Sequence, residues 1–520
     1  MASDQAATTV PLDCWEDNEK KRVVLAEASG DFIDVLFSFL TLPLGTIVRL
    51  GINFQLSVEM GSIKKLYESV QNLGSDVFWN DICKQMLLNP RNPLEASCQR
   101  LKVKVDDTNP TKYFICHSCS TEKNLLLSTF DGGRCYCGKL MRKNMDLLVE
   151  SKEETAAENG VFVKGDAKFL IFDDLTVLRS TPSKSVQKFL EHRRKDFEIP
   201  TISKDVDMKE IFSILKQALI SKSPLSEVFF KKEGSKSCSC PYSCPCSRNT
   251  NPIHWKDSIK IKVMVNKSNN KIVLAEADGD FVDFLFSFLT TPLGSILNLT
   301  NGKFPLGSIG NLYRSVKRLD PSWFKGSSKE SLLNLRVAPH FGCKSSPFQE
   351  DHTPNYWYGT VAGKDNNEGR TMISKKKDML QTAKELKLFD PRCSDGAKEP
   401  GVGFVKRPCL FVVKDDLEVI QMTTTSSIEY LRDEKVKVGD LEEHLVEIRS
   451  NEVMNLLRAS LTSNEATLTR SLGCLLMKWK CQRCIPLWGR LQRMKKIHRK
   501  KKENGENSCN ILCCCSVCDK

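Results

Sequence analysis

The sequence contains two long blocks that are nearly identical. Residues 24–50 read VLAEASGDFIDVLFSFLTLPLGTIVRL, and residues 273–299 read VLAEADGDFVDFLFSFLTTPLGSILNL. Shorter blocks repeat in the same order further along the chain, while the offset falls from 249 to 242 residues. A period of this length indicates the duplication of a whole domain, because the repeats of a solenoid are several times shorter.

Each copy predicts the same order of elements. A β-branched, apolar stretch at residues 22–28 predicts a strand, and apolar side chains at helical spacing follow at residues 32–40. In both copies a proline and a glycine are expected to end that helix: Pro43 and Gly45, and Pro292 and Gly294.

Three further elements are predicted in the first copy. They are a helix at residues 63–73, a hairpin within residues 160–178 that turns at Gly165–Asp166, and a closing helix at residues 207–219. Strands and helices do not alternate regularly in this order. The predicted fold class is therefore α+β, with two tandem homologous domains.

Charge and cysteine content divide the chain further. The formal net charge is +13, and residues 478–520 alone hold 12 basic and three acidic side chains. We predict five segments. They are a polar N-terminal segment (1–19), a first repeat domain (20–232), a linker rich in cysteine, serine and proline (233–257), a second repeat domain (258–477) and a basic, cysteine-rich tail (478–520).

The repeated blocks resemble a known plant family. The motifs that carry the resemblance are the paired LAEA-x-GDF-[IV]-D-x-LFSFLT-x-PLG blocks, the FVK…DDL hairpin and the LLRASL helix, over about Lys20 to Leu472. On these motifs the chain is similar to the family catalogued as domain of unknown function 674. The resemblance implies a plant protein with a tandem arrangement and a cysteine cluster in its first copy. It implies no reaction, since that family has no established activity.

Two close cysteine pairs in the first copy have the spacing of metal ligands. Fifteen residues separate Cys116 and Cys119 from Cys135 and Cys137. Four thiolates in two pairs suit tetrahedral Zn²⁺, and four protein ligands leave no position for a catalytic water. We therefore predict structural zinc in a zinc-ribbon-like insertion, with unligated thiols as the alternative. His117, between two ligands, is expected to face solvent.

The second copy has no cysteine where this cluster stands. Another four cysteines lie in the linker, at Cys238, Cys240, Cys244 and Cys246, with His254 further on. They form a candidate second metal site for zinc or copper(I), but their serine- and proline-rich surroundings favour an exposed, reduced linker.

Repeated carboxylates raise the alternative of an enzyme with acid–base chemistry. These residues are Glu27, Asp31 and Asp34, with Glu276, Asp280 and Asp283 in the second copy. A role near the start of a helix is favoured for Asp31 and Asp34, because a helix N-terminus prefers negative charge. The pairs Asp173–Asp174 and Asp415–Asp416 are expected in turns. No phosphate loop, nucleophile elbow or dinucleotide-binding motif occurs, so no catalytic residue is assigned.

The tail has three interpretations besides a solvated extension. Trp488, Leu491 and Ile497 can anchor a basic amphipathic helix on calmodulin or on an anionic membrane. Cys513, Cys514 and Cys515 are candidate lipidation sites beside a basic run. The same run also resembles a nuclear address.

The sequence favours a non-catalytic, zinc-stabilised interaction module in the cytoplasm or nucleus. No signal peptide precedes the repeats and no window is apolar enough to span a membrane, so we expect reduced thiols. Residues 1–477 carry a net charge of only +4, which argues against nucleic-acid binding by the folded domains. The sequence does not identify a protein partner.

Overall fold

The computed structural model describes residues 8–17, 19–56, 58–119, 125–148, 160–181, 183, 201–230, 258–343, 353–361, 370–392, 403–433, 436–473 and 475–476. Contacts divide the chain into one unit of residues 1–471 and another of residues 472–520. The elements below belong to the first unit, which is an α+β structure with three sheets.

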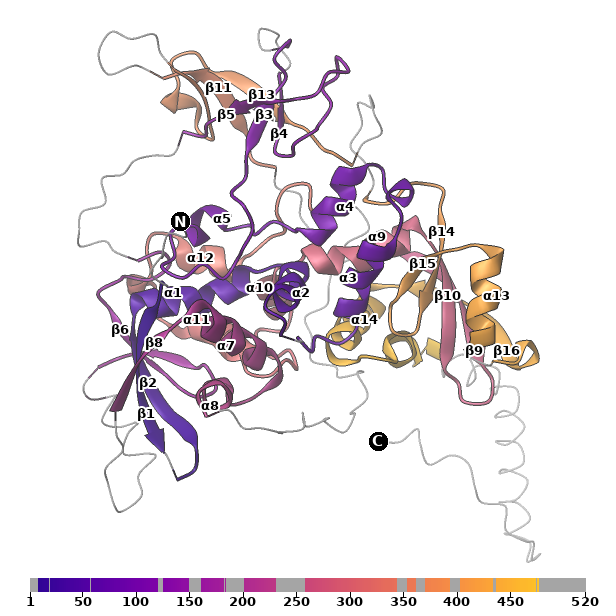
Figure 1. The fold of residues 1–520 in the computed structure, drawn as a ribbon, viewed down its shortest axis with the longest axis horizontal. Coiled ribbons are helices and arrows are strands. Elements are labelled where there is room, and N and C mark those ends of the chain that lie inside the picture. The colour runs from indigo at the N-terminus through magenta and orange to yellow at the C-terminus, as the bar shows by residue number, and fades with distance from the viewer. Residues whose placement is uncertain are drawn as a thin grey trace, which may run out of the picture. The chain divides into compact units, whose positions relative to one another are not determined.

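Two of the sheets have five strands each and the same strand order (Figure 1). The first runs β7 (Val177–Arg179), β6 (Lys168–Ile171), β2 (Arg22–Ser29), β1 (Val10–Asp17) and β8 (Thr201–Val206). The second runs β15 (Val419–Gln421), β14 (Leu410–Lys414), β10 (Ile272–Asp278), β9 (Ile259–Asn266) and β16 (Leu441–Ile448). The repeated sequence blocks therefore occupy equivalent places in two equivalent sheets.

Helices follow the strands in the same order in both copies. The first copy has α1 (Gly30–Ser38), α2 (Leu44–Asn53), α3 (Ile63–Asn72), α4 (Asp81–Leu88), α5 (Glu95–Cys98), α7 (Met208–Ile220) and α8 (Pro224–Phe229). The second has α9 (Gly279–Thr290), α10 (Leu293–Leu299), α11 (Ile309–Arg318), α12 (Ser328–Leu333), α13 (Thr424–Asp433) and α14 (Ser450–Thr462). α9 is buried on nearly every side, which explains its phenylalanine-rich sequence.

Strand β1 lies before residue 20, in the segment expected to be a polar lead-in. Val10, Leu12 and Cys14 are fully buried and alternate with more exposed neighbours, which is the pattern of a strand with one face on a core. Its antiparallel pairing with both β2 and β8 places it inside the sheet.

Two local predictions were wrong. The hairpin of β6 and β7 turns at Asp173–Asp174 and not at Gly165–Asp166. Gly45 and Gly294 do not end a helix. Each lies in the first turn of the next helix, α2 or α10, which begins directly after Pro43 or Pro292. A Cβ atom on Gly45 would lie 3.0 Å from the carbonyl oxygen of Leu289, so this glycine permits close approach to the other repeat.

One helix of each repeat reaches across to an edge strand of the other repeat's sheet. α3 contacts α9 and β15, whereas α11 contacts α1 and β7. The Ser69 hydroxyl in α3 accepts the backbone N–H of Val419 at 2.9 Å, and the Ser315 hydroxyl in α11 accepts that of Val177 at 2.9 Å. Ser69 is equivalent to Ser315, and Val177 is equivalent to Val419. Each repeat therefore makes the same hydrogen bond to the other.

The repeats also meet where their helices change direction. The backbone N–H of Leu44 donates to Thr291 O at 3.1 Å, and that of Leu293 donates to Leu42 O at 2.9 Å. These bonds form a bridge between Pro43 and Pro292. Equivalent residues that contact each other in this way are related by a local two-fold symmetry.

The third sheet combines strands of both repeats. Its order is β12 (Thr371–Ser374), β11 (Tyr356–Thr360), β13 (Lys384–Leu388), β4 (Leu125–Ser128), β3 (Tyr113–Ile115) and β5 (Lys143–Met145). The two halves join through the parallel pairing of β13 with β4, and Figure 1 shows the purple and orange strands side by side.

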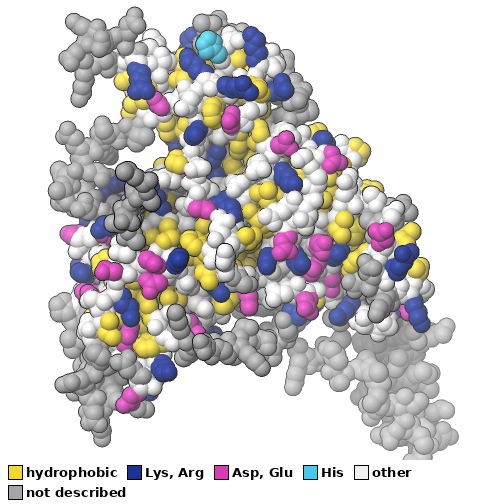
Figure 2. All heavy atoms as spheres, in the orientation of Figure 1, with side chains coloured by type: hydrophobic (Ala, Val, Ile, Leu, Met, Phe, Trp, Pro, Cys, Tyr) yellow, Lys and Arg dark blue, Asp and Glu magenta, His cyan; other side chains and the backbone are white. Residues whose placement is uncertain are grey.

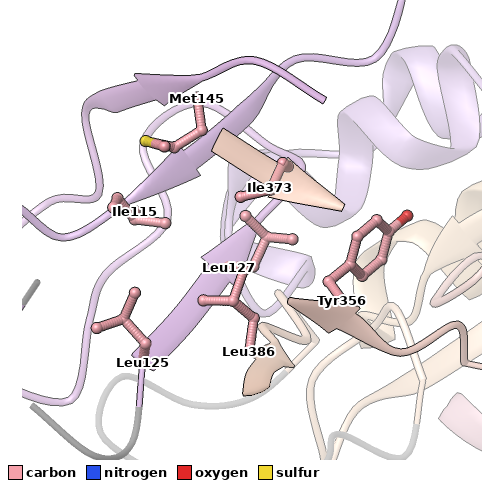
Figure 3. Packing of buried hydrophobic residues seen from close by; sticks show 7 residues of the cluster. All are labelled: Ile115, Leu125, Leu127, Met145, Tyr356, Ile373 and Leu386. Atoms are coloured by element: carbon pink, nitrogen blue, oxygen red, sulfur yellow. The ribbon is translucent and has the colours of Figure 1, made fainter. Parts of the chain in front are cut away.

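This sheet closes into a small barrel. The backbone N–H of Ile373 donates to Asp146 O at 3.1 Å, and that of Leu148 donates to Ile373 O at 2.7 Å. β12 is thereby joined to the residues that follow β5. Every strand contributes to the buried interior shown in Figure 3, which consists of Ile115, Leu125, Leu127, Met145, Tyr356, Ile373 and Leu386.

Candidate metal centre

Elements of the barrel position the four cysteines of the first repeat. Cys116 directly follows β3, and Cys119 lies three residues further on. Cys135 and Cys137 lie between β4 and β5, in a tight hairpin. β3 pairs with β4 on one side and with β5 on the other. This pairing brings the two cysteine pairs to one place.

The sulfur atoms converge at the distances expected of metal ligands. All four Sγ atoms lie within 4.8 Å of one another. The Cys116 and Cys137 Sγ atoms are 3.6 Å apart, and those of Cys119 and Cys135 are 3.8 Å apart. Zn–S bonds of about 2.3 Å place tetrahedral ligands about 3.8 Å apart. A disulfide would require about 2.05 Å, so the cluster is four separate sulfurs.

Backbone hydrogen bonds define the hairpin that carries the second pair. The Cys135 N–H donates to Lys139 O at 2.8 Å, and the Gly138 N–H donates to Cys135 O at 2.8 Å. Gly138 has a φ of +80°, which glycine adopts without strain. The chain can therefore reverse within one residue of Cys137.

The surroundings of the thiols differ in their effect on ionisation. The backbone N–H of Lys139 lowers the pKa of the Cys137 thiol to about 7. Burial raises the pKa of Cys119 and of Cys135 above the usual range. A bound divalent cation would favour the thiolate form of its ligands, because metal-binding cysteines are deprotonated.

The cluster is packed against the barrel wall. Cys116, Cys119 and Cys135 are buried with Leu126 and Met141, while Cys137 is exposed. Phe389, from the second repeat, packs on the same group. Gly133 permits this contact, since a Cβ atom there would lie 3.1 Å from the Phe389 ring. The cluster thus rests on both repeats.

Four thiolates can fill the coordination sphere of one divalent metal ion. Within the described part of the chain, no histidine or carboxylate joins the group. His117 is exposed, as expected.

The second repeat places β11 and β12 in its half of the barrel, and β11 begins with Tyr356 and Trp357 where the first repeat has Tyr113 and Phe114.

The buried carboxylates hold loops. Asp34 accepts the backbone N–H groups of Val161, Phe162 and Val163 at 2.5, 2.9 and 2.8 Å. Burial raises the pKa of Asp34 to about 7, although these hydrogen bonds oppose the shift. The predicted role of Asp34 at its own helix start was wrong, because the side chain points to a distant segment.

Asp283 also holds a loop in the second repeat, and there an arginine side chain joins the backbone N–H groups as a partner. It accepts the N–H groups of Phe404 and Val405 at 2.8 and 3.1 Å and pairs with Arg407 at 2.7 Å. Burial raises the pKa of Asp283 to about 6 against the effect of Arg407. The clue in the sequence was an acidic residue inside an apolar helical stripe.

The remaining repeated carboxylates have separate partners. Asp31 pairs with Lys102 at 2.5 Å, and Glu27 accepts a hydrogen bond from Ser180 at 3.2 Å. In the second copy Glu276 pairs with Lys262 at 3.4 Å and Asp280 with Arg407 at 2.8 Å. Asp31 lies in the first turn of α1, as expected, but the N-cap residues are Ser29 and Asp278.

The aspartates of the hairpin turns also connect elements. Asp173 accepts the backbone N–H and the hydroxyl of Ser226 at 2.8 and 2.6 Å, and the Ser226 hydroxyl accepts the N–H of Val23 at 2.8 Å. Asp415 binds Thr469 in the same way at 2.7 and 2.8 Å. Burial raises the pKa of Asp415 to about 6. These contacts are structural and equivalent in both repeats.

A buried charged group that the sequence analysis missed connects the barrel to the helices. Arg392 donates two hydrogen bonds to Asp390 at 2.9 and 2.8 Å, and His340 Nδ1 lies 3.4 Å from the same carboxylate. Burial alone would raise the pKa of Asp390, but His340 and Arg392 hold it below its usual range. Next to this group, Asn80 donates to Pro391 O at 2.6 Å. No sequence motif marks these residues.

Several predicted sites lie outside the described residues. They are the linker cysteines Cys238, Cys240, Cys244 and Cys246 with His254, the tail anchors Trp488, Leu491 and Ile497, and the candidate lipidation sites Cys513, Cys514 and Cys515. Their assignments stay predictions. None of the helices in the described ranges has both the length and the apolar content needed to cross a lipid bilayer.

Fold and cluster together define an α+β protein with interlocked repeats and a four-cysteine group able to bind metal. The chain belongs to the family described as protein of unknown function (DUF674), whose model matches residues 6–451. No curated protein and no solved structure matches the chain.

Proposed function

We propose that the protein is a non-catalytic interaction module whose barrel is stabilised by one structural Zn²⁺. The ligands are Cys116, Cys119, Cys135 and Cys137. The observation that carries the proposal is the spacing of their sulfurs, at 3.6 and 3.8 Å for two pairs, against about 3.8 Å for tetrahedral zinc thiolates.

The ion supplies stability that the strands lack. β3 and β5 have three residues each and β4 has four, and strands this short are marginal alone. Zinc would tie the end of β3 to the hairpin between β4 and β5. Because β4 pairs with β13, one ion supports a barrel to which both repeats contribute.

A non-catalytic role is supported by the occupancy of the polar groups. Four thiolate ligands leave no coordination position for a substrate or water. Asp34 and Asp283, the most buried of the repeated carboxylates, already bind backbone N–H groups. An acid–base mechanism would need these groups to face a substrate instead.

Reduced, metal-binding thiols are consistent with the cytoplasm or the nucleus. We propose one of these compartments, and a plant source follows from the family resemblance. Association with calmodulin or an anionic membrane through residues 478–520 remains a second proposal that depends on the tail sequence alone.

Metal content of the full-length protein tests the zinc site. We expect the double variant Cys116→Ser/Cys119→Ser to contain one zinc per chain less than the wild type, by inductively coupled plasma mass spectrometry. Cys409→Ser, at a half-buried free thiol, is the matched control and should retain the full count. A variant that changes all four linker cysteines to serine shows whether the linker adds a second equivalent.

Thiol alkylation of the wild-type protein provides a test that needs no variant. Cys116, Cys119, Cys135 and Cys137 should resist alkylation until a chelator is added, as read by peptide mass spectrometry. Unchanged zinc content in the double variant, or equal alkylation of exposed Cys137 with and without chelator, would reject the site. A single iron in place of zinc would reject the identity of the metal.

A further inference from the structure

The positive charge of the folded part is concentrated on the barrel. The described barrel residues, at 111–119, 125–148, 353–361 and 370–392, contain 12 basic and five acidic side chains, a net charge of +7. Residues 1–477 as a whole carry +4, so the rest of that region carries −3. In Figure 2 basic side chains gather at the top of the view, where Figure 1 shows the barrel strands. The overall charge that argued against a polyanionic partner is thus an average over unlike surfaces.

The tip of the second cysteine hairpin presents an aromatic ring between cations. Tyr136 lies between the ligands Cys135 and Cys137 and is 48% exposed. Arg134 and Lys139 flank it and are exposed. Lys139 Nζ donates to Ser118 Oγ at 3.0 Å, which joins this hairpin to the segment between Cys116 and Cys119, and Arg134 donates to Gly138 O at 3.2 Å. An ion that fixes both neighbouring cysteines would hold the ring in place.

A second aromatic residue lies on the outer wall of the barrel. Trp357 in β11 is half-buried and points away from the interior, since its neighbour Tyr356 belongs to the interior cluster. Lys377 Nζ lies 5.3 Å from the centre of the Trp357 ring. Lys377 ends a run of three exposed lysines that begins at Lys375. Aromatic faces and cations therefore occur together at two places.

We infer that the hairpin around Tyr136 binds single-stranded nucleic acid. In this complex Tyr136 stacks on a base, and Arg134 and Lys139 contact phosphates. The inference rests on the proposed interaction module and names its partner. Single strands expose base faces for stacking, whereas a duplex covers them, and cations next to aromatic rings are the features that such binding uses. Cations alone suffice for an acidic protein segment, whereas a flat ring exposed between cations also offers a face on which a base can stack.

Binding of a fluorescein-labelled, mixed-sequence 20-nucleotide RNA, measured by anisotropy, tests the inference. The full-length chain should be used with Lys495, Lys496 and Lys500–Lys502 changed to glutamine, so that the basic tail does not dominate. We expect Tyr136→Ala to weaken binding about 10-fold, as loss of one stacked base does. Tyr136→Phe keeps the ring and should bind like the parent.

The salt dependence separates the phosphate contacts from stacking. Arg134→Gln/Lys139→Gln should reduce the slope of log K against log salt by about 1.4, at about 0.7 per phosphate contact on a single strand. Lys64→Gln/Lys65→Gln removes the same charge from α3, where Lys64 is exposed and Lys65 half-buried, and should reduce the slope by less than about 0.7, half of that change. Duplex DNA of equal length should bind more weakly than the RNA.

The outcomes distinguish this inference from the zinc site, because zinc content is measured in every sample. Normal zinc with no RNA binding, or equal loss in the α3 control, overturns the inference and leaves the zinc-stabilised module standing. Equal affinity for duplex and single strand, or binding only to phosphatidylserine vesicles, overturns it too. Absence of zinc from the parent protein rejects the proposed function itself.

Discussion

Asp34 and Asp283 are equivalent residues with different electrostatic surroundings. Both accept backbone N–H groups of the segment that precedes a hairpin, but only Asp283 also pairs with a guanidinium group, that of the half-buried Arg407. Each carboxylate therefore fixes a connection that has little regular structure of its own. Their importance is for stability.

The substitution Asp34→Asn tests this role. An amide must place an NH₂ group where one carboxylate oxygen now faces a backbone N–H, so a buried donor loses its acceptor. We expect the free energy of unfolding to fall by about 2 kcal/mol at pH 5, measured by urea titration. Asp31→Asn, at a partly exposed ion pair, should change it by less than about 1 kcal/mol.

The pKa of Asp34 also predicts a pH dependence. Burial raises this pKa to about 7, so the folded state binds the proton more tightly than the unfolded chain does. The stability contributed by the protonated group is complete below about pH 4 and is lost as the pH rises through 7. The advantage of the wild type over Asp34→Asn should therefore shrink between pH 5 and pH 8. An advantage that grows over this range would contradict the assignment.

The sequence indicated that the cysteines lie together, but it did not indicate the partners of the carboxylates. Cysteine pairs with short spacing have few other uses in a reduced protein, so Cys116 to Cys137 could be selected without a structure. Asp34 could not be interpreted, because its partners at residues 161–163 lie more than a hundred positions away and contribute only backbone groups.

Elements of the two repeats meet at glycines where a side chain cannot fit. Gly61 has a φ of +54°, and a Cβ atom there would lie 2.4 Å from Ser460 O in α14. Gly307 is equivalent, with a φ of +34° and a Cβ that would lie 2.4 Å from Ala218 O in α7. Both contacts join one repeat to the closing helix of the other.

Alanine at either glycine should destabilise the protein strongly. We expect Gly61→Ala and Gly307→Ala each to lower the free energy of unfolding by more than about 3 kcal/mol, since backbone strain adds to a clash with a backbone oxygen. Gly326→Ala is the control, because Gly326 has a φ of +48° and nothing within 4 Å of the Cβ position. It should cost only about 1 kcal/mol, the strain alone. Equal losses at all three positions would contradict the interlocking contacts.

Most long elements could be predicted from periodicity, and the short ones could not. The strand at residues 22–28, the helix at 63–73 and the closing helix at 207–219 are present as β2, α3 and α7. The barrel strands β3 and β5 were missed because three residues are too few to show an alternating pattern.

At the scale of the whole molecule, the two repeats form one interlocked structure. Equivalent segments cannot be told apart by their sequence patterns, so nothing in the sequence shows whether a helix covers its own sheet or the other. The structure shows that α3 and α11 each contact an edge strand of the other repeat, through Ser69 and Ser315, and that the barrel has strands from both copies.

Interlocking predicts that the repeats stay together when the chain is cut. A specific protease site placed within residues 233–257 would separate the halves covalently. After cleavage we expect one complex of unchanged size by size-exclusion chromatography with light scattering, because α3 and α11 pack across the two halves and the barrel takes strands from both. Two separate folded monomers would contradict the interlocking of the repeats.

Zinc binding by the four cysteines of the barrel can be observed in a crystal. An anomalous difference map from a crystal, recorded at the zinc absorption edge, tests it most directly. We predict a single strong peak at about 2.3 Å from each of the Sγ atoms of Cys116, Cys119, Cys135 and Cys137. No peak at this position, or a disulfide between any two of these sulfurs, would show that the cluster is not a zinc site.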